Sequence, residues 1–183
     1  MKWLIFLVFF SIVNLSNGQI MNLKADVSVL PVITQNCGHS GFGREVVISD
    51  SMAVVGAANF LYGSAIVFNK DAMGNWVNSQ TISPGLAGYS SSNVGSTVDI
   101  GSDYLVLGAD EYDYDEMGSN FLINSGAAYI FMKDTSGNWV EHQKIVASNR
   151  EGADCFGRVV SVSGDFIFVS APLLKISSGA FSN

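Results

Sequence analysis

The sequence predicts an all-β protein built from copies of one four-stranded unit, and three observations indicate this. The chain repeats itself, because segments that begin FG or VG, at Phe42, Val94 and Phe156, are each followed by a similar apolar run. Self-similarity at a period of about 50 residues is typical of one supersecondary unit used several times. Short runs of Val, Ile, Phe and Tyr alternate with Gly, Asp, Asn and Ser, which is the pattern of strands and turns. No stretch after residue 18 carries a sustained helical period.

Each unit divides into four runs, which we interpret as the strands of an antiparallel meander. The runs of the first unit are residues 45–48, 52–56, 65–68 and 76–82, and those of the second are 96–100, 104–108, 127–132 and 139–146. Between the third and fourth runs stand KDAMGNWV (70–77) and KDTSGNWV (133–140), where Asp begins a turn and Gly-Asn supplies positive φ. This is the chemistry of a tight hairpin.

The second run of each unit is apolar without interruption. It reads MAVVGA at 52–57, YLVLGA at 104–109 and FIFVSA at 166–171. An unbroken apolar run fits a strand that is covered on both faces. The small residues at its end indicate a place where another backbone approaches closely. Face-to-face stacking of four-stranded blades around an axis meets both demands, so the sequence predicts the blades of a β-propeller.

These phrases, together with SGAAYIF at 125–131, resemble the FG-GAP repeat of integrin alpha chains and of many exported proteins. The resemblance covers residues 42–183. It implies a propeller, seven-bladed in most relatives, that acts as an extracellular binding or adhesion platform. Integrin-type repeats often carry an Asp-x-Asp-x-Asp-Gly calcium loop between their first two strands. This chain has only short turns there, so we do not carry calcium over to those turns.

We divide the chain into a signal peptide, an extension and three repeats. They span residues 1–18 (signal), 19–41 (an extension that could supply a ring-closing strand), 42–93 (first repeat), 94–155 (second repeat, with an acidic insert at 110–125) and 156–183 (third repeat, truncated). About three blades result, below the roughly four to eight that propellers have. We therefore expect an incomplete propeller: a fragment of a longer protein, or a ring completed by further repeats or self-association.

The N-terminus predicts export. Lys2 precedes the apolar run 3–13 and the small residues 16–18, the pattern of a secretory signal that is cut after Gly18. The run is shorter than the roughly 20 residues that a membrane-spanning helix needs. We therefore expect a secreted, extracellular protein without membrane insertion once the signal is removed.

The charge balance excludes one class of partner. The chain has 9 Lys and Arg against 16 Asp and Glu, a net charge of −7, and no basic cluster. Such a protein lacks the electrostatic footprint of nucleic-acid binding, and anionic membrane surfaces are disfavoured for the same reason.

Cysteine and histidine form no recognisable catalytic or zinc site. Cys37 and Cys155 each precede the start of a repeat; export would permit a disulfide between them, and whether they come close enough is open. His39 lies near Cys37, yet a zinc site takes four ligands. His142 is expected on the surface of the fourth run. No P-loop or Gly-x-Ser-x-Gly motif occurs, so we predict no enzyme and no resident cofactor.

The insert at 110–125 clusters four carboxylates, which are candidate ligands for a hard cation such as Ca²⁺. They are Asp110, Asp113, Asp115 and Glu116. The alternative is a solvated acidic loop with two exposed tyrosines. Those tyrosines, Tyr112 and Tyr114, are also candidate anchors for a partner, since Tyr is enriched in contact surfaces.

Taken together, these patterns predict a secreted, non-enzymatic binding or adhesion module that presents propeller loops to a protein or glycan partner. Two alternatives remain open at this point. One is an accessory propeller fragment of a secreted hydrolase, and the other is a calcium-binding structural repeat protein.

Overall fold

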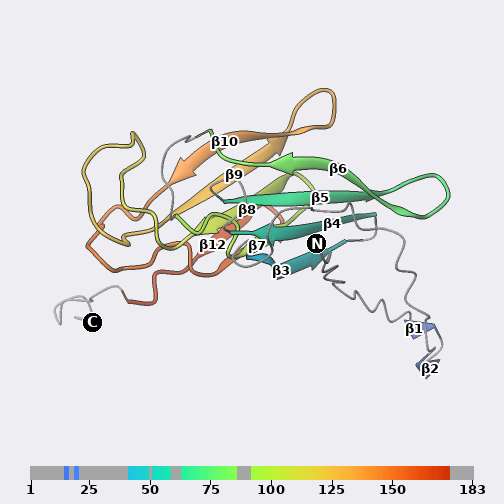
Figure 1. Ribbon diagram of the computed structural model, residues 1–183, viewed down its shortest axis with the longest axis horizontal. Helices are drawn as coiled ribbons and strands as arrows, with labels where there is room; N and C mark the ends of the chain where they lie inside the picture. Colours follow the sequence, from blue (N-terminus) through green and yellow to red (C-terminus); the bar gives the residue numbers. More distant parts are fainter. Residues whose placement is uncertain are drawn as a thin grey trace, which may run out of the picture.

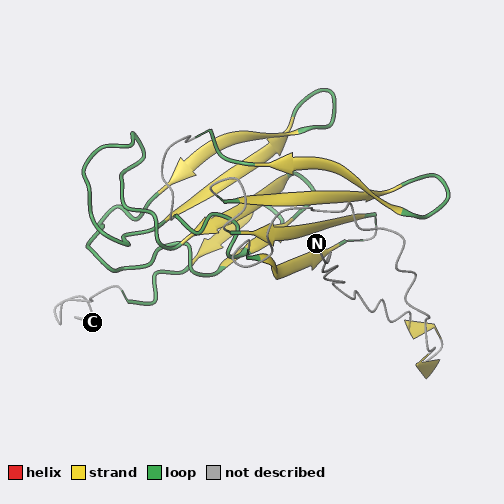
Figure 2. Cartoon of the chain, in the orientation of Figure 1, coloured by secondary structure: helices red, strands yellow, loops and turns green. Residues whose placement is uncertain are grey.

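The computed structural model describes residues 41–49, 51–58, 63–85 and 92–173, and the backbone of two short paired strands, β1 (Leu15–Ser16) and β2 (Gln19–Ile20) (Figure 1). Within these ranges the chain forms strands, turns and loops, and no helix (Figure 2). The described residues therefore include no helix that could span a membrane. Most of the expected signal peptide and N-terminal extension lies outside these ranges.

Two four-stranded meanders and one further hairpin make up this fold. The first unit holds β3 (Phe42–Ile48), β4 (Met52–Ala57), β5 (Ser64–Lys70) and β6 (Trp76–Ile82). The second holds β7 (Val98–Ile100), β8 (Tyr104–Ala109), β9 (Ala127–Lys133) and β10 (Trp139–Ile145). The third contributes β11 (Val160–Ser163) and β12 (Phe166–Val169). Neighbours in sequence pair antiparallel within each unit, so the predicted all-β meander class is confirmed.

Two strands begin two or more residues from the predicted position, while β5 begins one residue early at Ser64. β7 starts at Val98 instead of residue 96, because a turn with positive φ at Asn93 (51°) and Gly95 (83°) precedes it. β3 starts earlier than expected, at Phe42, because Phe42 pairs with Ala57 beyond a bulge. Both differences arise at the FG or VG sequence, where the chain enters a unit.

The β5–β6 hairpin and the β9–β10 hairpin have the same type of turn. Asp71 Oδ1 accepts hydrogen bonds from the backbone N–H groups of Met73 and Asn75, both at 2.8 Å. Asp134 Oδ1 accepts the equivalent bonds from Ser136 and Asn138, both at 2.9 Å. Each turn also contains a glycine with a φ near 85°. The KDxxGNW sequence thus forms the tight turn that it predicted.

The apolar core lies between consecutive units. One cluster of buried side chains joins β4 and β5 of the first unit to β8 and β9 of the second; it includes Val54, Val67, Leu105, Leu107, Tyr129 and Phe131. A second cluster places Val106 and Ile130, on the other face of the second unit, against Val160 of the third. Strand β8 is therefore buried on both faces, as its unbroken apolar sequence predicted. The units stack face to face in the manner of propeller blades (Figure 1).

The glycines of the FG and GA sequences meet where two units join. The carbonyl oxygen of Gly95 lies so near Gly56 of the preceding unit that a Cβ on Gly56 would come within 3.0 Å of it. Gly108 and the carbonyl oxygen of Gly157 repeat this contact between the second and third units. Gly95 and Gly157 also take positive φ, 83° and 90°. We name this contact the unit joint; it gives the physical reason for glycine at both places.

Side chains of one unit also hold backbone N–H groups of the next. A carboxylate oxygen of Glu45 accepts a hydrogen bond from Val98 N–H at 3.3 Å. Thr97 Oγ1 accepts one from Val160 N–H at 3.4 Å. Glu45 and Thr97 occupy the same position, two residues after the joint glycine of their units. The first strands of successive units are therefore linked by a repeated polar contact beside the unit joint.

The outer strands are linked by a glutamine. Gln80 Nε2 donates to the carbonyl oxygen of Trp139 at 2.6 Å, and Trp139 N–H donates to Gln80 Oε1 at 2.8 Å. The Lys133 ammonium lies 5.0 Å from the centroid of the buried Trp139 ring. Lys70 and Trp76 repeat this distance in the first unit. The recurring tryptophans are thus part of the packing between and beside the units.

We expect Gly108→Ala to lower the free energy of unfolding by about 2 kcal/mol or more, because the added methyl group would press on the Gly157 carbonyl. Urea denaturation measures the change. Gly85→Ala is the matched control, since a Cβ at Gly85 meets no atom within 4 Å. Equal stabilities for the two variants would contradict the role of the unit joint.

Candidate functional site

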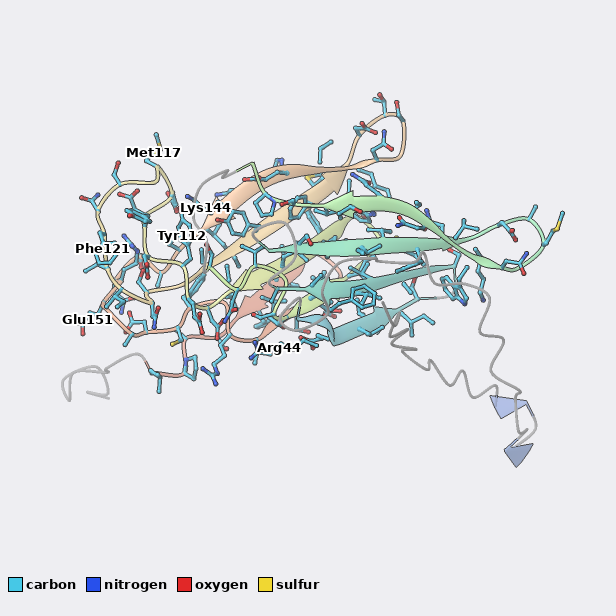
Figure 3. All side chains as sticks on the ribbon, in the orientation of Figure 1. Arg44, Tyr112, Met117, Phe121, Lys144 and Glu151 are labelled. Atoms are coloured by element: carbon cyan, nitrogen blue, oxygen red, sulfur yellow. The ribbon has the colours of Figure 1, made fainter. Side chains whose placement is uncertain are left out.

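The insert between β8 and β9, residues 110–125, forms a long loop at one end of the second unit (Figure 3). Its two ends are fixed, because Ala109 of β8 pairs with Ala127 of β9. Met117 and Phe121 lie on the outer part of this loop in Figure 3, and Tyr112 lies nearer the sheet. We name residues 110–125 the insert loop.

A third copy of the aspartate turn orders the outer part of the insert loop. Asp115 Oδ1 accepts hydrogen bonds from Met117 N–H at 3.0 Å and Ser119 N–H at 2.8 Å. Gly118 takes a φ of 75°, and Asn120 Nδ2 donates to the other carboxylate oxygen of Asp115. These hydrogen bonds hold the pKa of Asp115 below its ordinary value, and the bond from Ser119 N–H has the largest effect. This is the arrangement found at Asp71 and Asp134, on a loop outside the repeat pattern.

The base of the insert loop is closed by further hydrogen bonds. Asp113 Oδ1 accepts a bond from Asn124 N–H at 2.7 Å, and the Asp113 carbonyl accepts one from Leu122 N–H at 2.6 Å. From the segment after β10, Arg150 Nη2 donates to Ser125 Oγ at 2.9 Å. The loop is therefore bonded both to itself and to the chain that leads into the third unit.

The four carboxylates predicted as calcium ligands are not gathered at one point. Asp110 is 5 % exposed and lies 3.7 Å from Arg158 of the third unit. Asp113 and Asp115 accept backbone N–H groups, and Glu116 is exposed. Among the residues with a described placement, no three Asp, Glu, His or Cys side chains are arranged to hold a metal ion. The insert loop thus shows no ligand set for Ca²⁺; its aspartates bond to the protein itself.

Tyr112 is not an exposed anchor, because its side chain is only 1 % exposed. Its ring meets that of Tyr129 edge-on, with centroids 6.2 Å apart, and Lys144 Nζ donates a hydrogen bond to its hydroxyl at 2.9 Å. The expectation of two exposed tyrosines is therefore wrong for Tyr112. Tyr114 is half-buried and packs edge-on against Tyr112 and Phe121. The two tyrosines fasten the insert loop to the second unit.

Tyr112 and Tyr129 are buried, and the neighbouring Lys144 is half-buried. Burial raises the pKa of the Tyr129 hydroxyl, and Tyr112 adds to the effect, so Tyr129 is neutral at physiological pH. Burial also lowers the pKa of Lys144. The Lys144 ammonium lies 4.7 Å from the centroid of the Tyr112 ring, so hydroxyl and ring both face the cation. Tyr112 therefore serves as the internal support of the insert loop.

Three apolar side chains stand out from the insert loop. Met117 is 87 % exposed, Phe121 58 % and Ile123 61 %. We name these three residues the loop patch. The exposed carboxylates of Glu111 and Glu116 belong to the same loop. The three side chains have in common that they are exposed on one loop beside polar groups, and exposed apolar area rimmed by polar groups is typical of interaction sites where it is contiguous.

Sequence reasoning noted the charges of the insert and missed the loop patch. The signal for it is the run FLIN at 121–124, which is apolar within an otherwise polar insert. The sequence DEMGS at 115–119 likewise repeats the D-x-x-G spacing of the two hairpin turns, and it identifies Asp115 as a turn residue. Both signals were present in the sequence beside the carboxylates.

The cysteine pair remains a prediction. Cys155 is buried and takes a φ of 54°, whereas Cys37 lies outside the residues that the structure describes, as does His39. His142 is exposed on β10, as expected.

In a comparison with protein families, residues 139–181 fit the model described as the FG-GAP repeat. The matched segment begins at the first residue of β10 and includes β11 and β12. The resemblance drawn from the FG and GA sequences is thereby confirmed for this part of the chain. Comparison with curated proteins gives no match.

We expect Tyr112→Phe to lower the free energy of unfolding by about 1–2 kcal/mol, because it removes the hydroxyl that accepts the Lys144 bond and keeps the ring. Thermal or urea denaturation measures the loss. Tyr104→Phe makes the same chemical change at a half-buried tyrosine of β8 and serves as the control. If Tyr112→Phe costs no more than Tyr104→Phe, the Lys144 contact does not support the loop.

We also expect the turn at Asp115 to open in acid. Its bonds need the ionised carboxylate, so they are present above the ordinary pKa of 3.8 and are lost as pH falls through the lowered pKa of the folded state. In an NMR titration, the Ser119 amide proton should shift with a midpoint below pH 3.8. Asp115→Asn removes the ionisable group and should abolish the titration. A midpoint at or above 3.8 would show that these bonds do not form in solution.

Proposed function

We propose that this chain, in which residues 139–181 fit the FG-GAP repeat, is an exported, non-enzymatic binding module whose insert loop contacts a protein partner. The observation that carries the proposal is the loop patch. Met117, Phe121 and Ile123 expose 58–87 % of their side chains on a loop that the protein orders in several ways.

The ordering of the loop supports a binding role. A flexible loop loses conformational entropy when it binds, and a loop already held in shape loses less. The Asp115 turn, the Tyr112–Lys144 contact and the Arg150 bond all restrain the insert loop before any partner arrives. Binding residues are commonly carried by loops on a rigid scaffold, and the stacked units form such a scaffold.

The chemistry of the loop patch favours a protein over a glycan. Met, Phe and Ile side chains gain from burying apolar area, and they offer no hydrogen bonds to sugar hydroxyl groups. The exposed Glu111 and Glu116 favour a partner whose apolar recess has a basic rim. The signal peptide expected from the sequence supports an encounter outside the cell.

The proposal is tested by capture and affinity measurement. The full chain is expressed for export, purified from the medium, and immobilised to capture extracellular and cell-surface proteins from the cells that make it. Captured proteins are produced separately, and their dissociation constants are measured by biolayer interferometry. We expect the triple variant Met117→Ser, Phe121→Ser, Ile123→Ser to bind at least tenfold more weakly, because it removes the apolar contact area.

Met73→Ser is the matched control, since Met73 is 89 % exposed on the β5–β6 turn and lies outside the insert loop. It should bind as tightly as the unaltered chain. Circular dichroism checks that the triple variant is folded. Retention of every captured protein at unchanged affinity by the triple variant would refute the role of the loop patch.

A further inference from the structure

Three backbone hydrogen bonds join the insert loop to the chain that enters the third unit. With the N–H donor given first, they are Ala153 to Ile123 (2.8 Å), Cys155 to Asn124 (3.0 Å) and Phe156 to Ser125 (3.0 Å). Gly126 and Phe156 continue the contact as a parallel bridge. We name residues 150–156 the entry segment. Its Glu151 and Phe121 of the insert loop lie at the same end of the molecule (Figure 3).

The joint glycine of the third unit lies between the two ends of the insert loop. A Cβ on Gly157 would come within 3.0 Å of the Ala127 carbonyl oxygen and 3.1 Å from Ala109 N. Ala109 and Ala127 flank the insert loop and pair with each other. In the first unit joint, Gly95 lies equally close to the Ser64 carbonyl. The connection between second and third strands therefore closes on the start of the next unit, and in the second unit this connection is the insert loop.

Side chains add to the contact between the insert loop and the entry segment. Arg150 Nη2 donates to Ser125 Oγ at 2.9 Å. Gly152 lies beside Ile123 of the loop patch, because a Cβ there would be 3.5 Å from the Ile123 carbonyl oxygen and 3.8 Å from its Cγ2 atom. One member of the loop patch is thus held in place by the chain of the third unit.

The two segments in contact contain backbone conformations that residues other than glycine rarely adopt. Asn124, Ala153 and Cys155 have φ values of 51°, 67° and 54°. Asparagine tolerates this region, whereas alanine and cysteine enter it at a cost. Such conformations persist only where the surrounding contacts hold them. If the third unit leaves the second, the entry segment can relax to ordinary backbone angles, and its bonds to the insert loop are lost.

We propose that the order of the insert loop depends on the packing of the third unit against the second, so that this packing regulates the loop patch. The inference rests on the proposed function, because it takes the loop patch as the site of contact with a partner. A loop released by the third unit must be ordered again when a partner binds, which weakens binding. By linkage, a bound partner stabilises the packed third unit by the same factor.

Amide hydrogen exchange on the full exported chain, followed by NMR, tests the coupling without a partner. Ile167 of β12 packs against the apolar cluster between the second and third units. Ile167→Asp places a charge in this contact and lies far from the insert loop in sequence. We expect the Leu122 and Asn124 amides, which bond to Asp113 within the loop, to exchange about tenfold faster or more.

Phe168→Asp is the matched control, because Phe168 is the next residue of β12 and is 66 % exposed. It should leave the exchange rates of the insert loop unchanged. Val160→Asp, at a side chain that is 5 % exposed in the same apolar cluster, is a second variant that separates the units. Exchange at Leu122 and Asn124 that neither Ile167→Asp nor Val160→Asp accelerates overturns the proposal. Equal acceleration of the β4 and β5 amides also overturns it, because the whole chain then unfolds together.

The coupling and the partner role fail separately. With a partner captured as described above, Ile167→Asp should bind about tenfold more weakly or worse, and Phe168→Asp as tightly as the unaltered chain. If the triple serine variant of the loop patch keeps its affinity, the proposed function is refuted, and the exchange rates still decide the coupling. If the triple variant loses affinity but Ile167→Asp accelerates exchange without weakening binding, the regulation of the loop patch is refuted.

Discussion

The contact between a glycine of one unit and a backbone carbonyl of the next determines how this protein is assembled. No side chain fits between Gly56 and the Gly95 carbonyl, or between Gly108 and the Gly157 carbonyl. Because the backbones touch, the apolar faces on either side come close enough to exclude water. The buried second strands follow from this approach. A repeat with the same apolar pattern but without these glycines would still stack. Its units would be further apart, and side chains would have to fill the gap between them.

The loops between strands can vary while this scaffold stays the same. Loops between strands can change length without moving the unit joint, and the insert loop is one such change. The protein orders that loop with a turn it also uses elsewhere, since Asp71, Asp115 and Asp134 bond the backbone in the same way. An acidic loop therefore need not be a metal site. Its carboxylates can be occupied by the backbone that carries them.

Local patterns predicted the fold, and contacts distant in sequence limited what could be said of the site. The strands and hairpins were predictable because alternation, apolar runs and the KDxxGNW turn are all local signals. The burial of Tyr112 was not, because it depends on Tyr129 of β9 and Lys144 of β10, and no pattern around residue 112 reports them. The pairing of Asp110 with Arg158 likewise joins two units. The D-x-x-G turn at Asp115 was local and therefore predictable, but the neighbouring acidic residues drew attention to a cation instead.

The link through Gln80 has a geometric consequence for the whole stack. At the unit joint, no side chain separates successive units, whereas at their outer strands the length of a glutamine spans from β6 to the backbone of β10. Two slabs held tightly at one edge and spaced at the other form a wedge. Gln143 occupies the position of Gln80 in the second unit, so the same spacer is available there. The tilt of one unit against the next thus follows from a short residue, glycine, at the unit joint and a long one, glutamine, at the outer strands.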